Sequence, residues 1–109
     1  METHNHDKKI GVFCYEFLGT AFLMYSIVML RGAVEVNGFL NAGLMFLAWK
    51  ISGGHFNPAI SVGMYVSMMK IGENAVTLGI MIVAQFAGAF FGILLAYLSI
   101  IDNTWKDEV

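Results

Sequence analysis

Long apolar runs separated by short polar segments dominate the chain. Residues 10–30 contain a single charged side chain, Glu16, and residues 75–101 contain none. Because a helix of about 20 apolar residues crosses the hydrocarbon core of a bilayer, both runs predict transmembrane helices. Residues 33–51 carry charged side chains only near their ends and predict a further span, since a lysine can extend its ammonium group to the headgroups. The predicted organisation is a polar N-terminal tail (1–9), spans at 10–30, 33–51 and 75–101, and a polar C-terminal tail (102–109).

A fourth apolar segment, residues 58–69, is too short to cross the membrane. As a helix it covers only about 18 Å, a length typical of re-entrant, interfacial or buried segments. It follows the sequence Ser-Gly-Gly-His-Phe-Asn at residues 52–57. The paired Gly53 and Gly54 permit irregular backbone, which is tolerated at membrane depth only where protein buries it or a watery cavity faces it. We therefore expect residues 52–69 to form a re-entrant loop and a short helix, with an ordinary surface turn as the alternative.

Asn57 and Pro58 predict the start of this short helix. Asn is a favoured N-cap residue, and Pro fits the first helical position because its missing N–H would have no partner inside the helix. If the side-chain oxygen of Asn57 caps the helix, its amide nitrogen is a free donor for a water or hydroxyl oxygen. The positive end of the helix dipole repels cations and affects neutral molecules little. The motif predicts a filter for neutral solutes, in which His55 either lines the pore or fixes the loop.

The composition indicates a membrane protein and excludes several functional classes. Of 109 residues, 58% are hydrophobic and 13% are charged, too few charged groups to cover the surface of a soluble chain of this size. The net charge of -2 argues against nucleic-acid binding, which requires a basic face. The sequence has no nucleophile triad, phosphate loop or metal-ligand cluster. We therefore expect no enzymatic activity, no catalytic residue, no cofactor and no metal site.

The segment from Ser52 to Gly63, SGGHFNPAISVG, closely resembles the first Asn-Pro-Ala loop of the aquaporins, the water and glycerol channels of the major intrinsic protein family. Two further matches stand in family order. Glu16-Phe-Leu-Gly19-Thr20 resembles a motif of the family's first helix, and Ala84-Gln85-Phe-Ala-Gly88 resembles its third helix. The resemblance extends from about residue 10 to residue 100. It implies an all-α membrane protein, with three transmembrane helices and one re-entrant half-helix over residues 10–101, equivalent to one repeat of the aquaporin fold.

The resemblance also implies roles for individual side chains. Asn57 would donate to a single file of water, and Glu16 would accept hydrogen bonds from buried loop backbone. Gln85 either supports the same region or forms a plain interhelical hydrogen bond. Counting back 20 residues from Asn57 reaches Asn37, where the family usually has a bulky filter group, and Asn41 lies one turn further on the same side. The expected pore and filter residues are Asn37, Asn41, Gly53, Gly54, His55, Asn57, Pro58 and Ala59.

Small residues recur every four positions along the third predicted span. They are Ala84, Gly88, Gly92 and Ala96. At this spacing they share one helix face, and small side chains let two helix backbones approach closely. We expect this strip to form a helix-packing surface.

The sequence contains one half of a family channel, which normally has six spans and two inverted halves. No second Asn-Pro-Ala motif is present, and nothing corresponds to the arginine that follows it. The chain could pair with another chain or with an inverted second copy of itself, serve as a degenerate structural subunit of a larger membrane assembly, or be a fragment of a longer product. We expect a multi-pass membrane protein whose partners are the lipid bilayer, a second channel half or other membrane subunits, and water or a small neutral solute.

Overall fold

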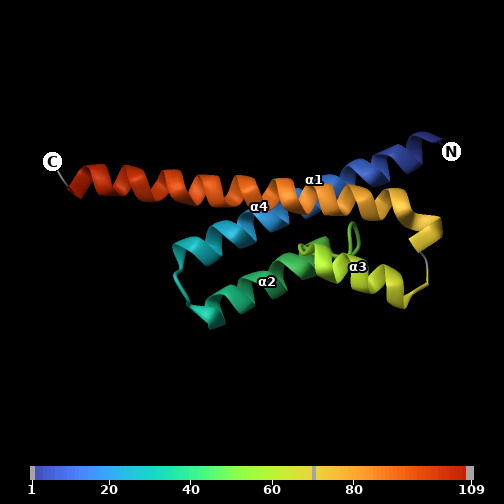
Figure 1. Cartoon of the computed structure of the whole chain (residues 1–109), viewed down its shortest axis with the longest axis horizontal. Helices are drawn as coiled ribbons and strands as arrows, with labels where there is room; N and C mark the ends of the chain where they lie inside the picture. Colours follow the sequence, from blue (N-terminus) through green and yellow to red (C-terminus); the bar gives the residue numbers. More distant parts are fainter. Residues whose placement is uncertain (1, 70, 108–109) are drawn as a thin grey trace.

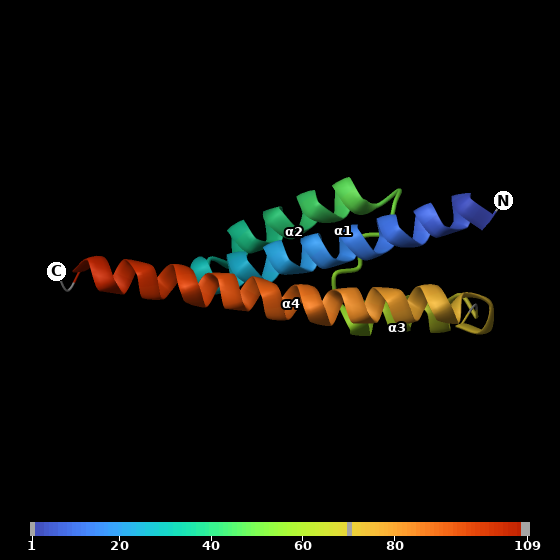
Figure 2. The same cartoon turned by 90° about the horizontal axis from the view of Figure 1, so that it is seen from above.

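The computed structural model describes residues 2–69 and 71–107, which form helices joined by short connections. The helices are α1 (Glu2–Met29), α2 (Val34–Ala48), α3 (Pro58–Ser67) and α4 (Ile71–Asp107). The two long helices, α1 and α4, run in the same direction and cross, while α2 and α3 run in the opposite direction (Figure 1). Among the described residues, α2 packs on α1 and α3 packs on α4, so the short helices flank different members of the long pair (Figure 2).

The strip of small residues on α4 lies against α1. A Cβ atom added to Gly88 would overlap the backbone carbonyl of Phe17, and one added to Gly92 would overlap the carbonyl of Ala21. Ala84 and Ala96, at the two ends of the strip, are fully buried. The four-residue spacing therefore places the small residues on one face of α4, and the backbone of α1 packs directly against this face.

The helix α2 is shorter than the predicted span at residues 33–51. Its 15 residues extend about 22 Å, less than the roughly 30 Å of a bilayer core. The helix ends at Ala48, whose carbonyl accepts the N–H groups of Ile51 at 3.0 Å and Ser52 at 2.9 Å. Gly53 then adopts a φ of 91°, the left-handed conformation that follows many helix ends. In the described part of the chain, two helices rather than three are long and apolar enough to cross a membrane: Asn5–Met29 and Gly72–Asp102.

The polar residues at both ends are helical and continue the long helices. α1 begins at Glu2 and α4 extends to Asp107, while residues 1, 108 and 109 lie outside the described residues. Neither polar end contains Pro or Gly, and each residue added to an existing helix gains a backbone hydrogen bond without a new nucleation cost. Near its start, α4 bends at Asn74, whose φ of -118° and ψ of 20° are not helical.

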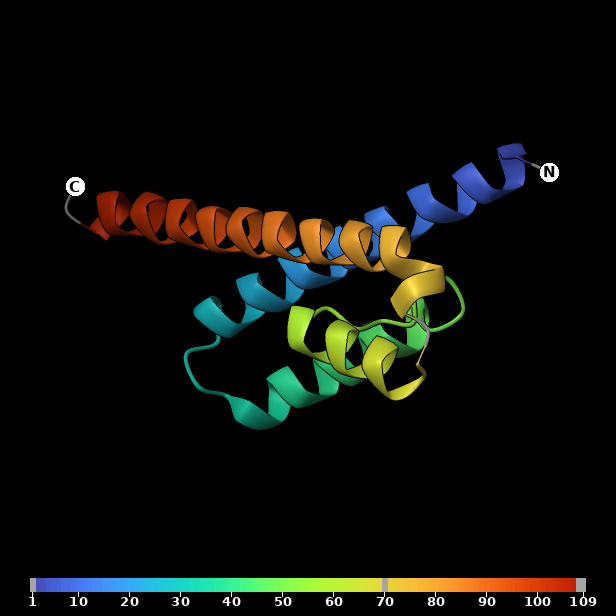
Figure 3. The ribbon, with the colours of Figure 1, turned by 45° about the vertical axis from the view of Figure 1, so that its right-hand side comes forward.

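The connection between α2 and α3 carries the chain back towards the middle of the molecule. Residues 49–57, which we call the Asn57 loop, follow the end of α2 and return inwards, so that α3 begins near the middle of the long axis and runs outwards (Figures 2 and 3). A buried set of polar side chains lies where this loop meets the long helices: Glu16, Ser61 and Gln85.

Candidate functional site

The carboxylate of Glu16 is the centre of a hydrogen-bond network that holds the Asn57 loop. Its Oε1 atom accepts from the Ser52 hydroxyl at 2.6 Å and from the backbone N–H of His55 at 3.0 Å. Its Oε2 atom accepts from the backbone N–H of Phe56 at 2.7 Å and from the Gln85 amide at 2.8 Å. A carboxylate has about four acceptor positions, and all of them are occupied. This contact joins α1, α4 and the loop through one fully buried side chain.

Ser61 extends the network to the ring of His55. The buried Ser61 hydroxyl accepts from the Gln85 amide at 2.8 Å and lies 2.9 Å from His55 Nδ1. Whether Ser61 Oγ or His55 Nδ1 donates in this bond depends on the tautomer of the imidazole. The other ring nitrogen, Nε2, is not bonded to Ser61. His55 is fixed by the network and still presents one ring nitrogen outwards.

The backbone of the loop depends on its two glycines. Gly53 and Gly54 have φ values of 91° and 64°, which lie in the left-handed region that favours glycine. A Cβ atom on Gly54 would also approach the Cα of Met45 on α2 to 2.9 Å. Glycine at position 54 therefore lets the loop pack closer to α2 than any other residue at that position would allow.

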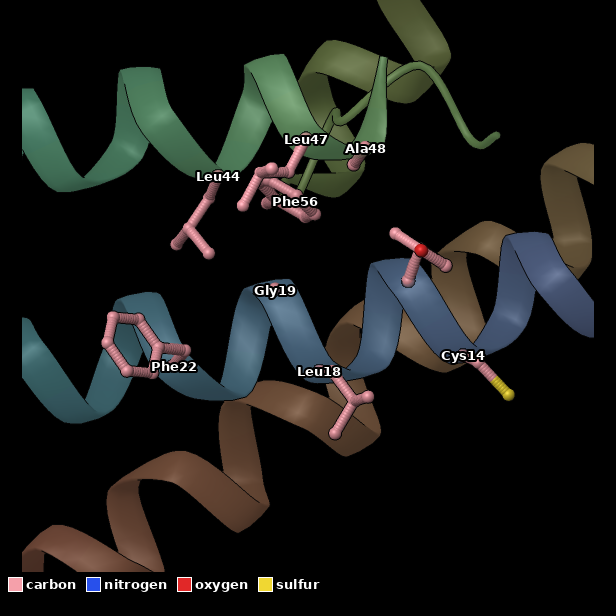
Figure 4. A pocket seen from close by; sticks show the side chains of 9 residues that line it. Cys14, Leu18, Gly19, Phe22, Leu44, Leu47, Ala48 and Phe56 are labelled. Atoms are coloured by element: carbon pink, nitrogen blue, oxygen red, sulfur yellow. The ribbon is translucent and has the colours of Figure 1, made fainter. Parts of the chain in front are cut away.

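Phe56 anchors the loop on α1. Its backbone has a φ of 51°, a conformation that is uncommon for a bulky residue and is held here by the bond from its N–H to Glu16. The buried Phe56 ring sits between α2 and α1, directly over Gly19 (Figure 4). A Cβ atom on Gly19 would overlap this ring. The ring also lines an apolar groove between the two helices, together with Cys14, Tyr15, Leu18, Gly19, Phe22, Leu44, Leu47 and Ala48.

Asn57 caps α3, as the sequence predicts. Its φ of -155° and ψ of 123° are extended, its side-chain oxygen accepts the N–H of Ala59 at 2.9 Å, and Pro58 occupies the first turn. The Asn57 side chain is exposed. Because the oxygen is used by the cap, the amide NH₂ is the group that faces outwards at the positive end of the helix. The site therefore offers an exposed hydrogen-bond donor, while the Glu16 carboxylate of the same site is buried and accepts four hydrogen bonds.

Asn37 and Asn41 lie on the side of α2 that faces α1. Asn37 Oδ1 accepts from the Ser26 hydroxyl of α1 at 3.0 Å. The Oδ1 atom of Asn41 is buried and has no hydrogen-bond partner in the described part of the chain. Neither side chain bonds to the Asn57 loop there, so their assignment to a filter stays a prediction.

Three residues of the network were not among the expected site residues: Ser52, Phe56 and Ser61. For Ser61 a signal exists, because it is the hydroxyl residue that lies one turn after Asn57 in a mostly apolar helix. The partners of Ser52 and Phe56 come from a distant helix, which local patterns do not reveal. Within residues 2–69 and 71–107, no group of three or more His, Cys, Asp or Glu side chains could hold a metal ion.

Two helices long and apolar enough to cross a membrane, and a glycine-containing loop fixed by a buried carboxylate, are consistent with a helical membrane protein. The family model for major intrinsic protein matches residues 4–107, and the chain belongs to this family. Members of the family are channels and facilitators, which agrees with the expectation that the protein is not an enzyme.

Two curated relatives are propanediol uptake facilitators named PduF. The protein from Salmonella typhimurium is 33% identical over 96 residues, covering 75% of this chain and 35% of the relative. The protein from Citrobacter freundii is 34% identical over 97 residues, covering 76% of this chain and 35% of the relative. The chain therefore spans about a third of the length of the relatives it matches. No solved structure matches it significantly.

Proposed function

We propose that the chain is one repeat of the aquaporin fold and forms half of a channel for water or small neutral solutes. In this arrangement α1, α2 and α4 span the bilayer, and the Asn57 loop with α3 is the re-entrant half-helix. The inward return of the loop and the outward direction of α3 support this proposal. The 15 residues of α2 are continued by the Asn57 loop, whose backbone donors bond to Glu16. A loop satisfied in this way can lie at membrane depth.

The exposed amide NH₂ of Asn57 is the single observation that carries the transport proposal. It stands at the positive end of α3, which favours a neutral molecule with an oxygen acceptor over a cation. A hydroxyl oxygen of a small diol meets the same requirement as a water oxygen. Since two relatives are propanediol uptake facilitators, we propose small diols together with water as the transported class.

A second half would complete the channel by placing another half-helix opposite α3. The two halves of such folds are related by an axis in the membrane plane, so the second half is either an inverted copy of this chain or another polypeptide. The alternative function is that of an accessory subunit in a larger membrane complex. The large exposed apolar side chains on the outside of α2 and α4 support it, because other subunits could cover them: Phe39, Phe46, Phe86 and Phe90.

Disulfide trapping distinguishes these partners. In an inverted pair the beginnings of the two α3 helices face each other, so Ala59→Cys in a Cys14→Ala background should form a covalent dimer on mild oxidation. Met69→Cys, beyond the far end of α3, is the matched control and should remain monomeric. Equal dimer yields at both positions would contradict the inverted pair. Co-purification of a stable complex with other membrane proteins in mild detergent, without the Ala59→Cys dimer, would support the accessory function.

A further inference from the structure

A second groove, separate from the one between α1 and α2, opens beside the Asn57 loop. It measures about 370 Å³ and is lined by Met45, Trp49, Gly53, His55, Ile60, Met64 and Met68. We call it the methionine groove. Three of its lining side chains carry a thioether sulfur and one carries an imidazole, and none carries a carboxylate.

The methionines reach the groove from two helices. Met64 and Met68 are four residues apart on α3 and therefore lie on the same face, with exposed fractions of 38% and 51%. Met45 faces them from the C-terminal part of α2. The Met side chain has three rotatable bonds and adapts its sulfur position easily. The sulfur atoms can therefore adjust around a small ligand without a change of backbone.

One nitrogen of the His55 imidazole is fixed by the network, and the other borders the groove. Its Nδ1 atom is 2.9 Å from the Ser61 hydroxyl, and a Cβ atom on Gly53 would lie 3.1 Å from Nε2. Nε2 therefore borders the same groove that Gly53 lines. A ligating histidine typically has its other ring nitrogen fixed by an outer partner. Nε2 binds a cation only when it carries no hydrogen, which is the tautomer in which the Nδ1 hydrogen is donated to Ser61 Oγ.

We propose that the methionine groove binds a soft monovalent cation, Cu(I) or Ag(I), through His55 Nε2 and the thioethers of Met64 and Met68, with Met45 as a further sulfur ligand. Thioether and imidazole ligands select Cu(I) and related soft ions, whereas Mg²⁺ and Ca²⁺ require oxygen ligands. The absence of carboxylates among the lining residues excludes the side-chain ligands of the hard ions. Gly53 and His55 are also expected pore residues, so the site adjoins the proposed pore, but its test measures metal binding and needs no transport.

Anaerobic titration with Cu(I) in detergent, against a chromogenic chelator that competes for the ion, tests the site. All proteins carry Cys14→Ala, because the free, exposed thiol of Cys14 would itself bind soft metals. The Met64→Leu/Met68→Leu variant removes two ligands while nearly preserving side-chain volume. Met69→Leu is the matched control, since Met69 is 93% exposed and does not line the groove. We expect one ion per chain, unchanged affinity in the control, and at least about tenfold weaker binding in the double variant.

X-ray absorption of the Cu(I)-loaded Cys14→Ala protein gives a second test that needs no ligand variant. Sulfur scatterers together with a nitrogen scatterer support the site, and a shell of nitrogen or oxygen alone overturns it. In the titration, equal affinities of the double variant and the Met69→Leu control show an adventitious ion only and overturn the proposal. The affinities of the variants for Ag(I), titrated in the same way, should follow the same order.

Discussion

The backbone N–H of Phe56 donates to the Glu16 carboxylate at 2.7 Å, across 40 residues of sequence. The neighbouring N–H of His55 donates to the other carboxylate oxygen. Two consecutive backbone donors of the loop are thereby satisfied by one side chain of α1. This contact fixes where α3 begins, and with it the position of the Asn57 amide. The geometry of the site therefore depends first on Glu16.

Replacing Glu16 with Gln should destabilise the fold strongly. The amide has one acceptor oxygen and an NH₂ group that would face N–H donors, so at least one pair of donors loses its acceptor. Each buried unsatisfied group costs about 1–3 kcal/mol, and we expect the free energy of unfolding to fall by at least about 2 kcal/mol. The measurement is reversible unfolding in mixed detergents, followed by circular dichroism.

The matched control for this substitution is Glu35→Gln on the exposed first turn of α2. It removes only a favourable charge near the helix N-terminus, which is worth about 0.3–1 kcal/mol. Equal losses in the two variants would show that the Glu16 network adds no specific stability.

Gly19→Ala should disturb the packing of the Phe56 ring on α1. The added methyl overlaps the aromatic ring, and overpacking of this kind typically costs about 1–3 kcal/mol. Gly38→Ala on α2 is the control, because a Cβ atom there meets nothing within 4 Å and should raise helix stability by about 0.5–1 kcal/mol. Thermal unfolding compares the two. Adding Phe56→Leu to Gly19→Ala should recover part of the loss, and no recovery would contradict the proposed contact.

Gly92→Ala tests the close approach of α1 and α4. The new methyl would overlap the carbonyl of Ala21, and since backbone cannot rotate away as a side chain can, the two helices must separate. We expect a lower midpoint of thermal unfolding. Gly79→Ala lies on the same helix in open space and should leave the midpoint unchanged or raise it. A Gly92→Ala protein as stable as Gly79→Ala would mean that the two helices do not pack at this strip.

Two substitutions of Asn57 separate its capping role from its role as a donor. Ala removes the cap and should cost about 1 kcal/mol. Asp retains a capping oxygen and adds a negative charge where the helix dipole favours it, so stability should be preserved. Both substitutions remove the amide NH₂, and both should lower solute permeability in reconstituted vesicles. Full permeability of a stable Asn57→Asp protein would exclude the amide as the filter donor.

Local chemistry in the sequence predicts the start of α3 and the packing strip of α4. The N-cap at Asn57 depends on neighbouring residues alone, and the spacing of Gly88 and Gly92 marks one helix face. The end of α2 is different, because it depends on bonds from the following loop to the Ala48 carbonyl. The roles of Phe56 and Ser61 also require partners that are brought together only by the fold.

Solute flux through proteoliposomes tests the central claim most directly. The protein is first shown to be oligomeric and is then reconstituted into vesicles. The vesicles are mixed rapidly with a solution of propanediol or of an impermeant osmolyte, and light scattering follows the vesicle volume. For the unmodified protein we expect diol or water permeability several-fold above that of empty vesicles, and for Asn57→Asp a value close to that of empty vesicles. Permeability of the unmodified protein equal to that of empty vesicles for both water and the diol would contradict the central claim.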